Sequence, residues 1–425
     1  MLVRQVACAC SKAMAHPSPR IIAPKLKSST DTREVKPSLE WLIHPILKSE
    51  FLERYFEKKP LVVKRNEADY FRNLLSLDEI DRVLTTLDRS TDEIILKNAK
   101  RESNTDDYTV DGDLDVARIC QLFGEGSTIT LAFLDAVVPQ LTQFCRHLEK
   151  EFSCPFQTNI YLTPPNAQGA KAHYDTHDVF VLQISGTKKW VIYGTPVELP
   201  LPGQDFDSEI HAVGEVTQEF TLKAGDVAYV PRGVVHDARS TDTTSLHVTA
   251  GVLRYTWTDL LMEFLASASL RDAEFRKSLP PEFAREGFDR AQARENLRRL
   301  LKRAAEAGDF DGALEHFADD FISKCRPTLR GQMAQIAELS RVSARSIAGV
   351  RSEAIFRMHS SADALHVDCY GRRISFPAQA AEAVRFALNH ERFTVGDLPG
   401  ELDEEEKIVV VRRLVKEGLA LVLEY

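Results

Sequence analysis

The spacing of hydrophobic residues changes along this chain, and the changes divide it into segments of different predicted structure. Before residue 153, apolar side chains recur every three or four positions, which is the spacing of helices. The expected helices lie at Leu39–Ile43, Phe51–Phe56, 76–87 and 136–152. Ser76, with Glu79 three residues later, is typical of a helix N-terminus. We expect a short strand or turn at 58–65 and a loop at 101–115.

Between residues 157 and 252 the pattern becomes that of a β-sheet protein. Short runs rich in β-branched and aromatic residues are separated by clusters of glycine, proline, aspartate and threonine, as in sandwiches and barrels. Ser185-Gly186 and Gly225-Asp226 are each expected to form the turn of a hairpin. We therefore predict an α+β protein whose core is a double-stranded β-helix, the jelly-roll or cupin barrel.

Helical spacing returns after residue 258, and the pattern changes once more near residue 346. The later helices are predicted at 258–269, 290–307 and 311–325. The last segment has the order strand, helix, turn, helix and strand, predicted at 364–376, 378–390, 393–402, 403–418 and 419–425. This is the order of a small winged-helix module.

Composition and charge exclude several classes of protein. The 425 residues are 44% hydrophobic and 28% charged, the balance of an ordinary globular protein. No run approaches the roughly 20 apolar residues that span a bilayer, so no membrane partner is expected. Asp and Glu number 63 against 54 Lys and Arg, a net charge of −9. We do not expect nucleic acid as a partner, because proteins that bind phosphates carry a basic surplus; a basic peptide is electrostatically easier to accept.

Cysteine usage and the first residues bear on the cellular compartment. The seven cysteines form no CxxC pair, and their odd number favours reduced thiols in a reducing compartment. The first 30 residues contain five basic and no acidic side chains. An organellar transit peptide would have such a composition, but we favour a flexible basic arm over residues 1–35 and a cytoplasmic protein.

Two histidines and an aspartate form the strongest chemical pattern. His173 and Asp175 are two positions apart, so on a strand both side chains would point to the same face. His236 follows on a later strand, after the turn at 231–233. Two imidazoles and one carboxylate on one side of a metal, with the other positions open, is the arrangement of non-haem Fe(II) oxygenases.

The sequence around this pattern resembles a known family. Gly225, Pro231, Gly233 and His236 have the spacing of the second cupin signature. The surrounding segments are similar to JmjC-type 2-oxoglutarate oxygenases, specifically to the ribosomal oxygenases, which are bacterial arginyl and eukaryotic histidyl protein hydroxylases. The matching segments are 55–65, 158–190, 225–240 and 245–251. More loosely, the resemblance extends to the end of the chain, because that branch has a helical dimerisation region and then a winged helix.

The resemblance implies roles for five residues. They are the Fe(II) ligands His173, Asp175 and His236, and the 2-oxoglutarate contacts Lys188 and Asn159. Lys188 would hold the distal carboxylate. A dicarboxylate in an apolar barrel needs a cation on physical grounds as well, but the pattern of residues alone does not choose between Lys188 and Lys189. O2 would be the remaining reactant.

Other residues near the pattern are expected to play supporting parts. His177 is expected at the mouth of the pocket or behind the ligands, and not as a fourth ligand. His247 and Ser245 either line the pocket or pack in the core. Trp190, Tyr161 and Tyr229 are expected to be core aromatics.

Taken with the resemblance, these patterns predict an Fe(II)- and 2-oxoglutarate-dependent dioxygenase that hydroxylates Arg or His of a ribosomal protein. The alternatives are a lysine demethylase, a hydroxylase of a small molecule or peptide, a non-catalytic cupin with a winged-helix regulator, and a cupin isomerase or dioxygenase that does not use 2-oxoglutarate. The implied domains are an arm (1–35), a JmjC/cupin domain (36–258, core 157–252), a helical region that forms a homodimer (259–345) and a winged helix (346–425). The acidic residues at 403–406 would repel DNA, so we expect the winged helix to support an interaction or the dimer.

Overall fold

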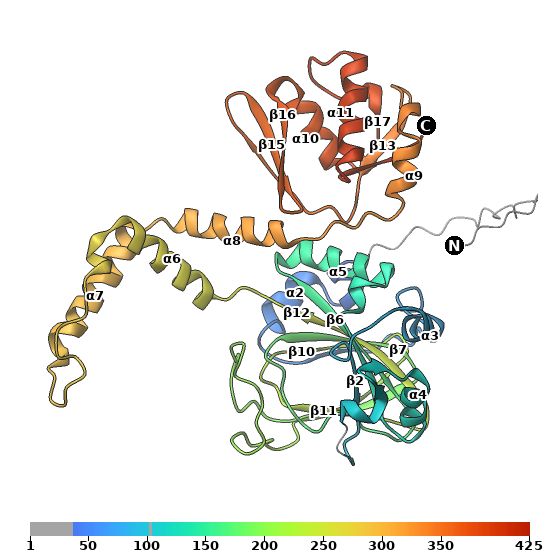
Figure 1. The fold of residues 1–425 in the computed structure, drawn as a ribbon, viewed down its shortest axis with the longest axis vertical. Coiled ribbons are helices and arrows are strands. Elements are labelled where there is room, and N and C mark those ends of the chain that lie inside the picture. The colour runs from blue at the N-terminus through green and yellow to red at the C-terminus, as the bar shows by residue number, and fades with distance from the viewer. Residues whose placement is uncertain (1–36, 102–103) are drawn as a thin grey trace, which may run out of the picture. The chain divides into compact units, whose positions relative to one another are not determined.

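The fold is organised around two antiparallel sheets that form a barrel (Figure 1). The structure is a computed structural model that describes residues 37–101 and 104–425. The predicted arm over residues 1–35 lies outside them. The larger sheet has the strand order β1-β10-β7-β12-β6-β5-β2, and the smaller sheet has the order β11-β8-β9. The mixture of helices with a barrel agrees with the predicted fold class.

The larger sheet takes in strands from well before the predicted barrel core. Its strands are β1 (Leu61–Val63), β2 (Ile94–Lys97), β5 (Thr128–Ala132), β6 (Phe156–Thr163), β7 (Asp178–Ser185), β10 (Val227–Val230) and β12 (Ser245–Val252). The smaller sheet consists of β8 (Thr187–Ile192), β9 (Gln218–Lys223) and β11 (His236–Ser240). Because β1, β2 and β5 precede residue 157, the barrel wall is built from more of the chain than the residues 157–252 predicted as its core.

Alternation along the strands separates the hydrophobic core from the pocket. On β12, Leu246 and Val248 are fully buried in a core shared with the N-terminal helices, whereas His247 and Thr249 line a pocket inside the barrel. The helices before the barrel are α1 (Leu39–Ile43), α2 (Lys48–Arg54), α3 (Leu77–Thr86), α4 (Val116–Gly124) and α5 (Pro139–Phe152). Burial of the outer face therefore leaves the inner face free to hold polar groups.

The prediction of two hairpins is wrong. β7 ends at Ser185 in the larger sheet and β8 begins at Thr187 in the smaller one, and the strands on either side of Gly225 also belong to different sheets. Gly186 has a φ of +66°, and a Cβ there would lie 1.9 Å from the carbonyl oxygen of Thr244. Only glycine fits this sharp crossing from sheet to sheet.

The helical prediction after the barrel agrees with the structure. The helices are α6 (Trp257–Arg271), α7 (Arg290–Ala307) and α8 (Phe310–Lys324). None of the helices in the described part of the chain is both long and apolar enough to cross a bilayer.

The C-terminal segment forms a second hydrophobic core of helices and strands. Its elements are α9 (Gln332–Ala337), β13 (Ile347–Val350), β14 (Arg357–Ser360), β15 (Ala364–Cys369), β16 (Arg372–Pro377), α10 (Ala381–Asn389), β17 (Phe393–Thr394), α11 (Glu404–Lys416) and β18 (Ala420–Glu424). The single strand predicted at 364–376 is two strands, because Tyr370 and Gly371 both adopt positive φ and form a tight turn between β15 and β16. Part of the predicted loop at 101–115 likewise forms the short pair β3 (Thr109–Val110) and β4 (Asp113–Leu114).

Candidate metal centre

The structure brings His173, Asp175 and His236 together. Their ligand atoms all lie within 4.8 Å of one another, and no other such group occurs in the ranges that the structure describes. The Asp175 carboxylate lies between the two rings, with Oδ1 3.8 Å from His173 Nε2 and Oδ2 3.8 Å from His236 Nε2. Metal–ligand bonds of about 2 Å would span these gaps, so the spacing fits one ion held by all three side chains.

The backbone brings the two histidines together in a way that differs from the prediction. His173 does not lie in a regular strand; it forms an isolated bridge with His236, the first residue of β11. The amide of His236 donates to the carbonyl of His173 at 2.8 Å, and the reverse bond is 3.1 Å. The two ligand segments are therefore fixed to each other by main-chain hydrogen bonds.

Hydrogen bonds also fix which ring nitrogens are free. Nδ1 of His173 lies 2.8 Å from the carbonyl of Lys171, and Nδ1 of His236 lies 3.0 Å from the carbonyl of Val234. A carbonyl only accepts, so each Nδ1 carries the proton and each Nε2 presents a lone pair toward Asp175. This is the tautomer that metal-binding histidines adopt.

Electrostatics favour the same protonation states. Burial disfavours a charged carboxylate, but the neighbouring histidines and Lys97 outweigh this effect and lower the pKa of Asp175. Burial lowers the pKa of His236. An ionised aspartate with a neutral histidine is the combination that a divalent cation requires, so the residues present fit a metal.

The triad opens into a cavity of about 110 Å³ inside the barrel, and Lys188 on β8 lines it. Lys188 is only 4% exposed, and its Nζ donates to Thr163 Oγ1 at 3.0 Å. Its neighbour Lys189 points to solvent and pairs with Glu219 at 2.7 Å. The structure therefore separates the two lysines that the residue pattern left open.

The other predicted residues divide between the pocket and the core. Asn159 and His177 line the cavity, as does His247. Ser245 is not among the lining residues; its hydroxyl accepts a hydrogen bond from Gln183 at 2.8 Å. Tyr229 is a core residue, as predicted.

Of the two other expected core aromatics, Trp190 is buried in a hydrophobic core cluster, as predicted, and also lines the pocket, whereas Tyr161 lines the pocket and belongs to no core cluster in the part of the chain that the structure describes. Trp190 Nε1, His247 Nδ1 and Thr130 Oγ1 are buried without a hydrogen-bond partner. Unsatisfied polar atoms are rare in protein interiors, so these groups indicate the place of a polar ligand.

Among the lining residues that sequence reasoning missed are Lys97 on β2 and Thr128 and Thr130 on β5. They come from strands that precede the predicted barrel core. The only signal was a short alternation of threonine with Ile129 and Leu131, which is too brief to distinguish a pocket wall from an ordinary strand.

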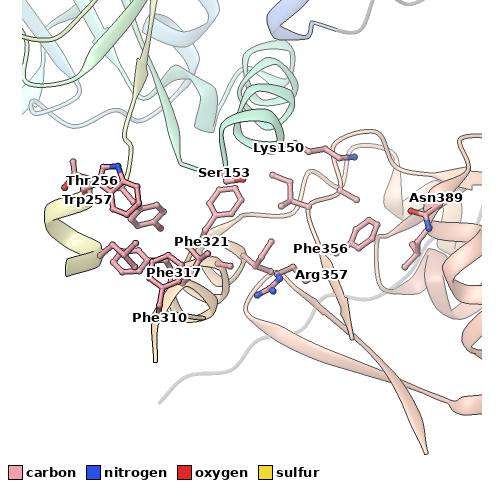
Figure 2. Close-up of a pocket in the computed structure, with 18 residues that line it drawn as sticks. Lys150, Ser153, Thr256, Trp257, Phe310, Phe317, Phe321, Phe356, Arg357 and Asn389 are labelled. Carbon is pink, nitrogen blue, oxygen red and sulfur yellow. The ribbon is translucent and has the colours of Figure 1, made fainter. Parts of the chain in front are cut away.

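A larger cavity of about 840 Å³ lies away from the triad (Figure 2). Figure 2 shows aromatic side chains such as Trp257, Phe310 and Phe321 along its wall. None of the triad residues is among those lining it. The candidate metal ligands therefore lie in the smaller of these two cavities.

Comparisons with known proteins relate this chain to the JmjC domain and to ribosomal oxygenases. Residues 134–260 match the model of the JmjC domain. Ribosomal oxygenase 1 of Danio rerio is 31% identical over 312 residues, which cover 68% of this chain and 56% of the relative. The bifunctional lysine-specific demethylase and histidyl-hydroxylase NO66 of Branchiostoma floridae is 30% identical over 345 residues, 76% of this chain and 52% of the relative. The chain thus spans about half the length of these curated relatives.

Solved structures show the same fold. The X-ray structure of E. coli ycfD is similar with a TM-score of 0.52 and 16% identity, covering 88% of this chain and 98% of that one. The ribosomal oxygenase YcfD from Escherichia coli, in complex with cobalt and 2-oxoglutarate, has a TM-score of 0.50 and 16% identity, with 89% and 99% covered. At this identity the likeness establishes the fold alone.

Proposed function

We propose that this chain, which belongs to the ribosomal-oxygenase branch of the JmjC-domain family, is an Fe(II)- and 2-oxoglutarate-dependent dioxygenase. Its proposed reaction is the hydroxylation of a side chain in a protein. The observation that supports this most strongly is the triad, whose two Nε2 atoms face one carboxylate beside the buried cation Lys188. The related YcfD structure, which contains cobalt and 2-oxoglutarate, supports the same pairing of a divalent metal with a dicarboxylate.

Each part of the pocket has a distinct task in this proposal. His173, Asp175 and His236 hold Fe(II), while Lys188 holds the distal carboxylate of 2-oxoglutarate. The unpartnered polar atoms of the pocket and Asn159 supply further hydrogen bonds to the co-substrate. When bound, Fe(II) with 2-oxoglutarate and O2 supplies the chemistry that inserts one oxygen atom into a C–H bond and releases succinate and CO2. Val179 and Val181 form an apolar wall that excludes water.

The charges of the pocket bear on the choice between arginine and histidine as the modified residue. Two lysines, Lys97 and Lys188, line the cavity, and the acidic residues among those lining it are Asp175 and Asp237. Asp237 alternates with His236 on β11, so its side chain lies on the other face, where it accepts a hydrogen bond from Tyr193 at 2.7 Å. A neutral imidazole is therefore easier to place here than an unpaired guanidinium.

The proposal also covers the oligomeric state, the C-terminal domain and the cellular location of the protein. Helices α6 and α7 expose large apolar side chains that water does not favour, among them Leu261, Met262, Leu270, Leu297 and Leu301. These residues support residues 259–345 as the region that forms a homodimer. The order β13, α10, α11, β18 supports a winged helix in residues 346–425. We keep the cytoplasm as the proposed location and a ribosomal protein as the substrate.

The proposal is tested by succinate formation. The protein is purified anaerobically, loaded with Fe(II) and given 2-oxoglutarate, and succinate is measured after O2 is admitted, with and without basic peptides that contain histidine or arginine. A stable product heavier by about 16 Da would indicate hydroxylation, whereas formaldehyde would indicate the lysine demethylase alternative. Metal binding without any 2-oxoglutarate binding or turnover would overturn the proposal in favour of another cupin function.

Co-substrate binding should weaken as the pH rises above about 7. Burial lowers the pKa of Lys188 to about 7, and a bound dicarboxylate favours the charged amine and so raises that pKa. Between the two pKa values, binding must take up a proton, so the dissociation constant is flat below pH 7 and rises by up to about tenfold per pH unit above it. Calorimetric titration of the Fe(II)-free protein with Co(II) and 2-oxoglutarate between pH 6.5 and 9 measures this trend. Lys188→Arg should flatten it, and a flat wild-type profile would contradict the assignment.

A further inference from the structure

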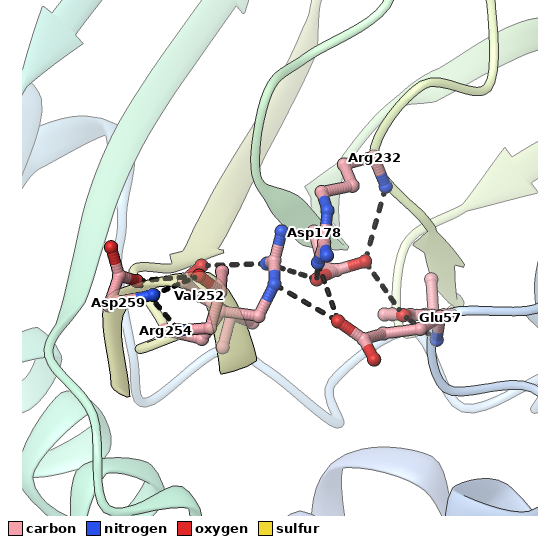
Figure 3. A network of polar contacts seen from close by, with 8 residues as sticks. Glu57, Asp178, Arg232, Val252, Arg254 and Asp259 are labelled. Atoms are coloured by element: carbon pink, nitrogen blue, oxygen red, sulfur yellow. Dashed lines mark hydrogen bonds and ion pairs between the residues drawn. The ribbon is translucent and has the colours of Figure 1, made fainter. Parts of the chain in front are cut away.

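Four charged side chains, three of them largely buried and the fourth partly exposed, form a network of ion pairs (Figure 3). Arg232 Nη1 lies 2.6 Å from Glu57 Oε1 and 3.4 Å from Asp178 Oδ2. Arg254 contacts the same two acids, with Nε 3.1 Å from Glu57 Oε1 and Nη1 against Asp178 Oδ2. Asp178 is fully buried, and the side chains of Arg232 and Arg254 are only 6% and 12% exposed. The formal charges of the four groups sum to zero.

Asp178 connects the network to both segments that bear metal ligands. It is the first residue of β7, three positions after Asp175. Its Oδ1 accepts the backbone N–H of Arg232 at 3.1 Å, in the turn that leads to His236. The next amide, that of Gly233, donates to the carbonyl of Asp175 at 3.0 Å. The turn before one ligand is thus bound to the chain around the other.

The turn itself packs closely against its surroundings. Gly233 has a φ of +82°, and a Cβ there would lie 2.1 Å from the carbonyl oxygen of Val197. On the opposite side, the Tyr229 hydroxyl donates to Asp178 Oδ1 at 3.0 Å and accepts from the amide of Glu57 at 2.8 Å. The carboxylate of Asp178 is therefore held from several sides, and its position determines that of the turn.

Charge makes the network sensitive to the loss of one member. Burial raises the pKa of Asp178, and the guanidinium of Arg254 opposes this effect. Removing one acid would leave two buried guanidinium groups facing a single carboxylate. Such an uncompensated charge is strongly unfavourable in a protein interior, and the neighbouring chain would move to relieve it.

We propose that the Glu57–Asp178–Arg232–Arg254 network sets the spacing of the metal ligands, with Asp178 as the central positioning residue that ties the turn at 231–233 to the segment of Asp175. This inference rests on the proposed metal site. Asp178 is neither in the cluster of ligand atoms nor among the residues that line the cavity; it acts through the backbone of Arg232 and Gly233. Its loss should therefore change metal affinity beyond any change in the stability of the fold.

The test compares two buried aspartates in the same barrel. Asp226 is 3% exposed and also accepts backbone amides, those of Arg65 and Lys223, each at 2.9 Å. The variants Asp178→Asn and Asp226→Asn make the same chemical change, and no contact of the Asp226 side chain leads to a metal ligand. Thermal unfolding of the metal-free proteins and the dissociation constant for Co(II), without 2-oxoglutarate, are measured for both.

We expect Asp178→Asn to weaken Co(II) binding roughly tenfold or more, the size seen when groups that orient metal ligands are lost, and Asp226→Asn to leave it within about twofold. Equal Co(II) affinity in wild type and Asp178→Asn, or an equal loss in Asp226→Asn, would overturn the inference. If Asp178→Asn does not fold, the variant Glu57→Gln, at the exposed end of the network, replaces it in the test. We expect Glu57→Gln to lower Co(II) affinity about threefold, and unchanged affinity would contradict the inference. Absence of Co(II) binding in the wild type would instead overturn the proposed function.

Discussion

Succinate formation is expected to fall at least about a thousandfold when His173 is replaced by alanine. The substitution removes one of three protein ligands, and with it the Nε2 lone pair that its hydrogen bond to Lys171 directs toward Asp175. A catalytic metal contributes several kcal/mol to a reaction, and each 1.4 kcal/mol corresponds to about a factor of ten in rate. The measurement is the rate of 2-oxoglutarate turnover under saturating Fe(II), together with Co(II) binding by calorimetry.

His177 provides the control for this prediction. It lines the same cavity four residues further along the chain but is not part of the cluster of ligand atoms. His177→Ala should therefore keep Co(II) affinity within about threefold of the wild type. Undiminished turnover in His173→Ala, or loss of the metal in His177→Ala, would mean that the ligand set is wrong.

Replacing Lys188 with alanine should raise the dissociation constant for 2-oxoglutarate about a hundredfold. Metal binding measured without 2-oxoglutarate should be retained. Lys188 is buried among the residues that line the cavity, and truncating one partner of a buried charged pair costs about 2–5 kcal/mol. Co-substrate binding is measured by calorimetry on the Co(II) protein, and turnover as a function of 2-oxoglutarate concentration separates KM from kcat. Lys188→Arg should recover part of the affinity because it restores the charge.

The adjacent lysine is a matched control. Lys189 alternates to the outer face of β8, where it pairs with Glu219 in solvent. Lys189→Ala should leave co-substrate affinity unchanged, because exposed ion pairs contribute little. If both variants bound 2-oxoglutarate as the wild type does, the distal carboxylate would have to be held elsewhere.

Local patterns predicted the helices well and the connections between strands poorly. The helix at 290–307 was predicted with its observed bounds because its leucine spacing is a property of the helix itself. Gly186 marks a turn correctly, but a turn signal does not specify whether the next strand pairs with the previous one or joins another sheet. That outcome depends on contacts such as the one with Thr244, which is 58 residues further along the chain.

The site residues that belong to short sequence motifs could be predicted from the sequence. The HxD pair and the second cupin signature named the three residues that the structure brings together. Lys97 and Thr130 were missed because they reach the pocket only through the pairing of β2 and β5 with β6. Tyr161 was assigned to the core because an aromatic residue in a strand has the same pattern whether it faces packed side chains or a cavity.

The main-chain bridge between His173 and His236 also bears on which metal the centre takes up. Main-chain hydrogen bonds join the segments that carry the two imidazoles, so binding of an ion needs little rearrangement of the backbone, and two imidazoles with one carboxylate suit most first-row divalent ions. Such a site follows the general order of affinities, in which Co(II), Ni(II) and Zn(II) bind more tightly than Fe(II). Cellular supply, and not the fold, would then keep the centre active, and mismetallation in an iron-poor cell would be its characteristic failure.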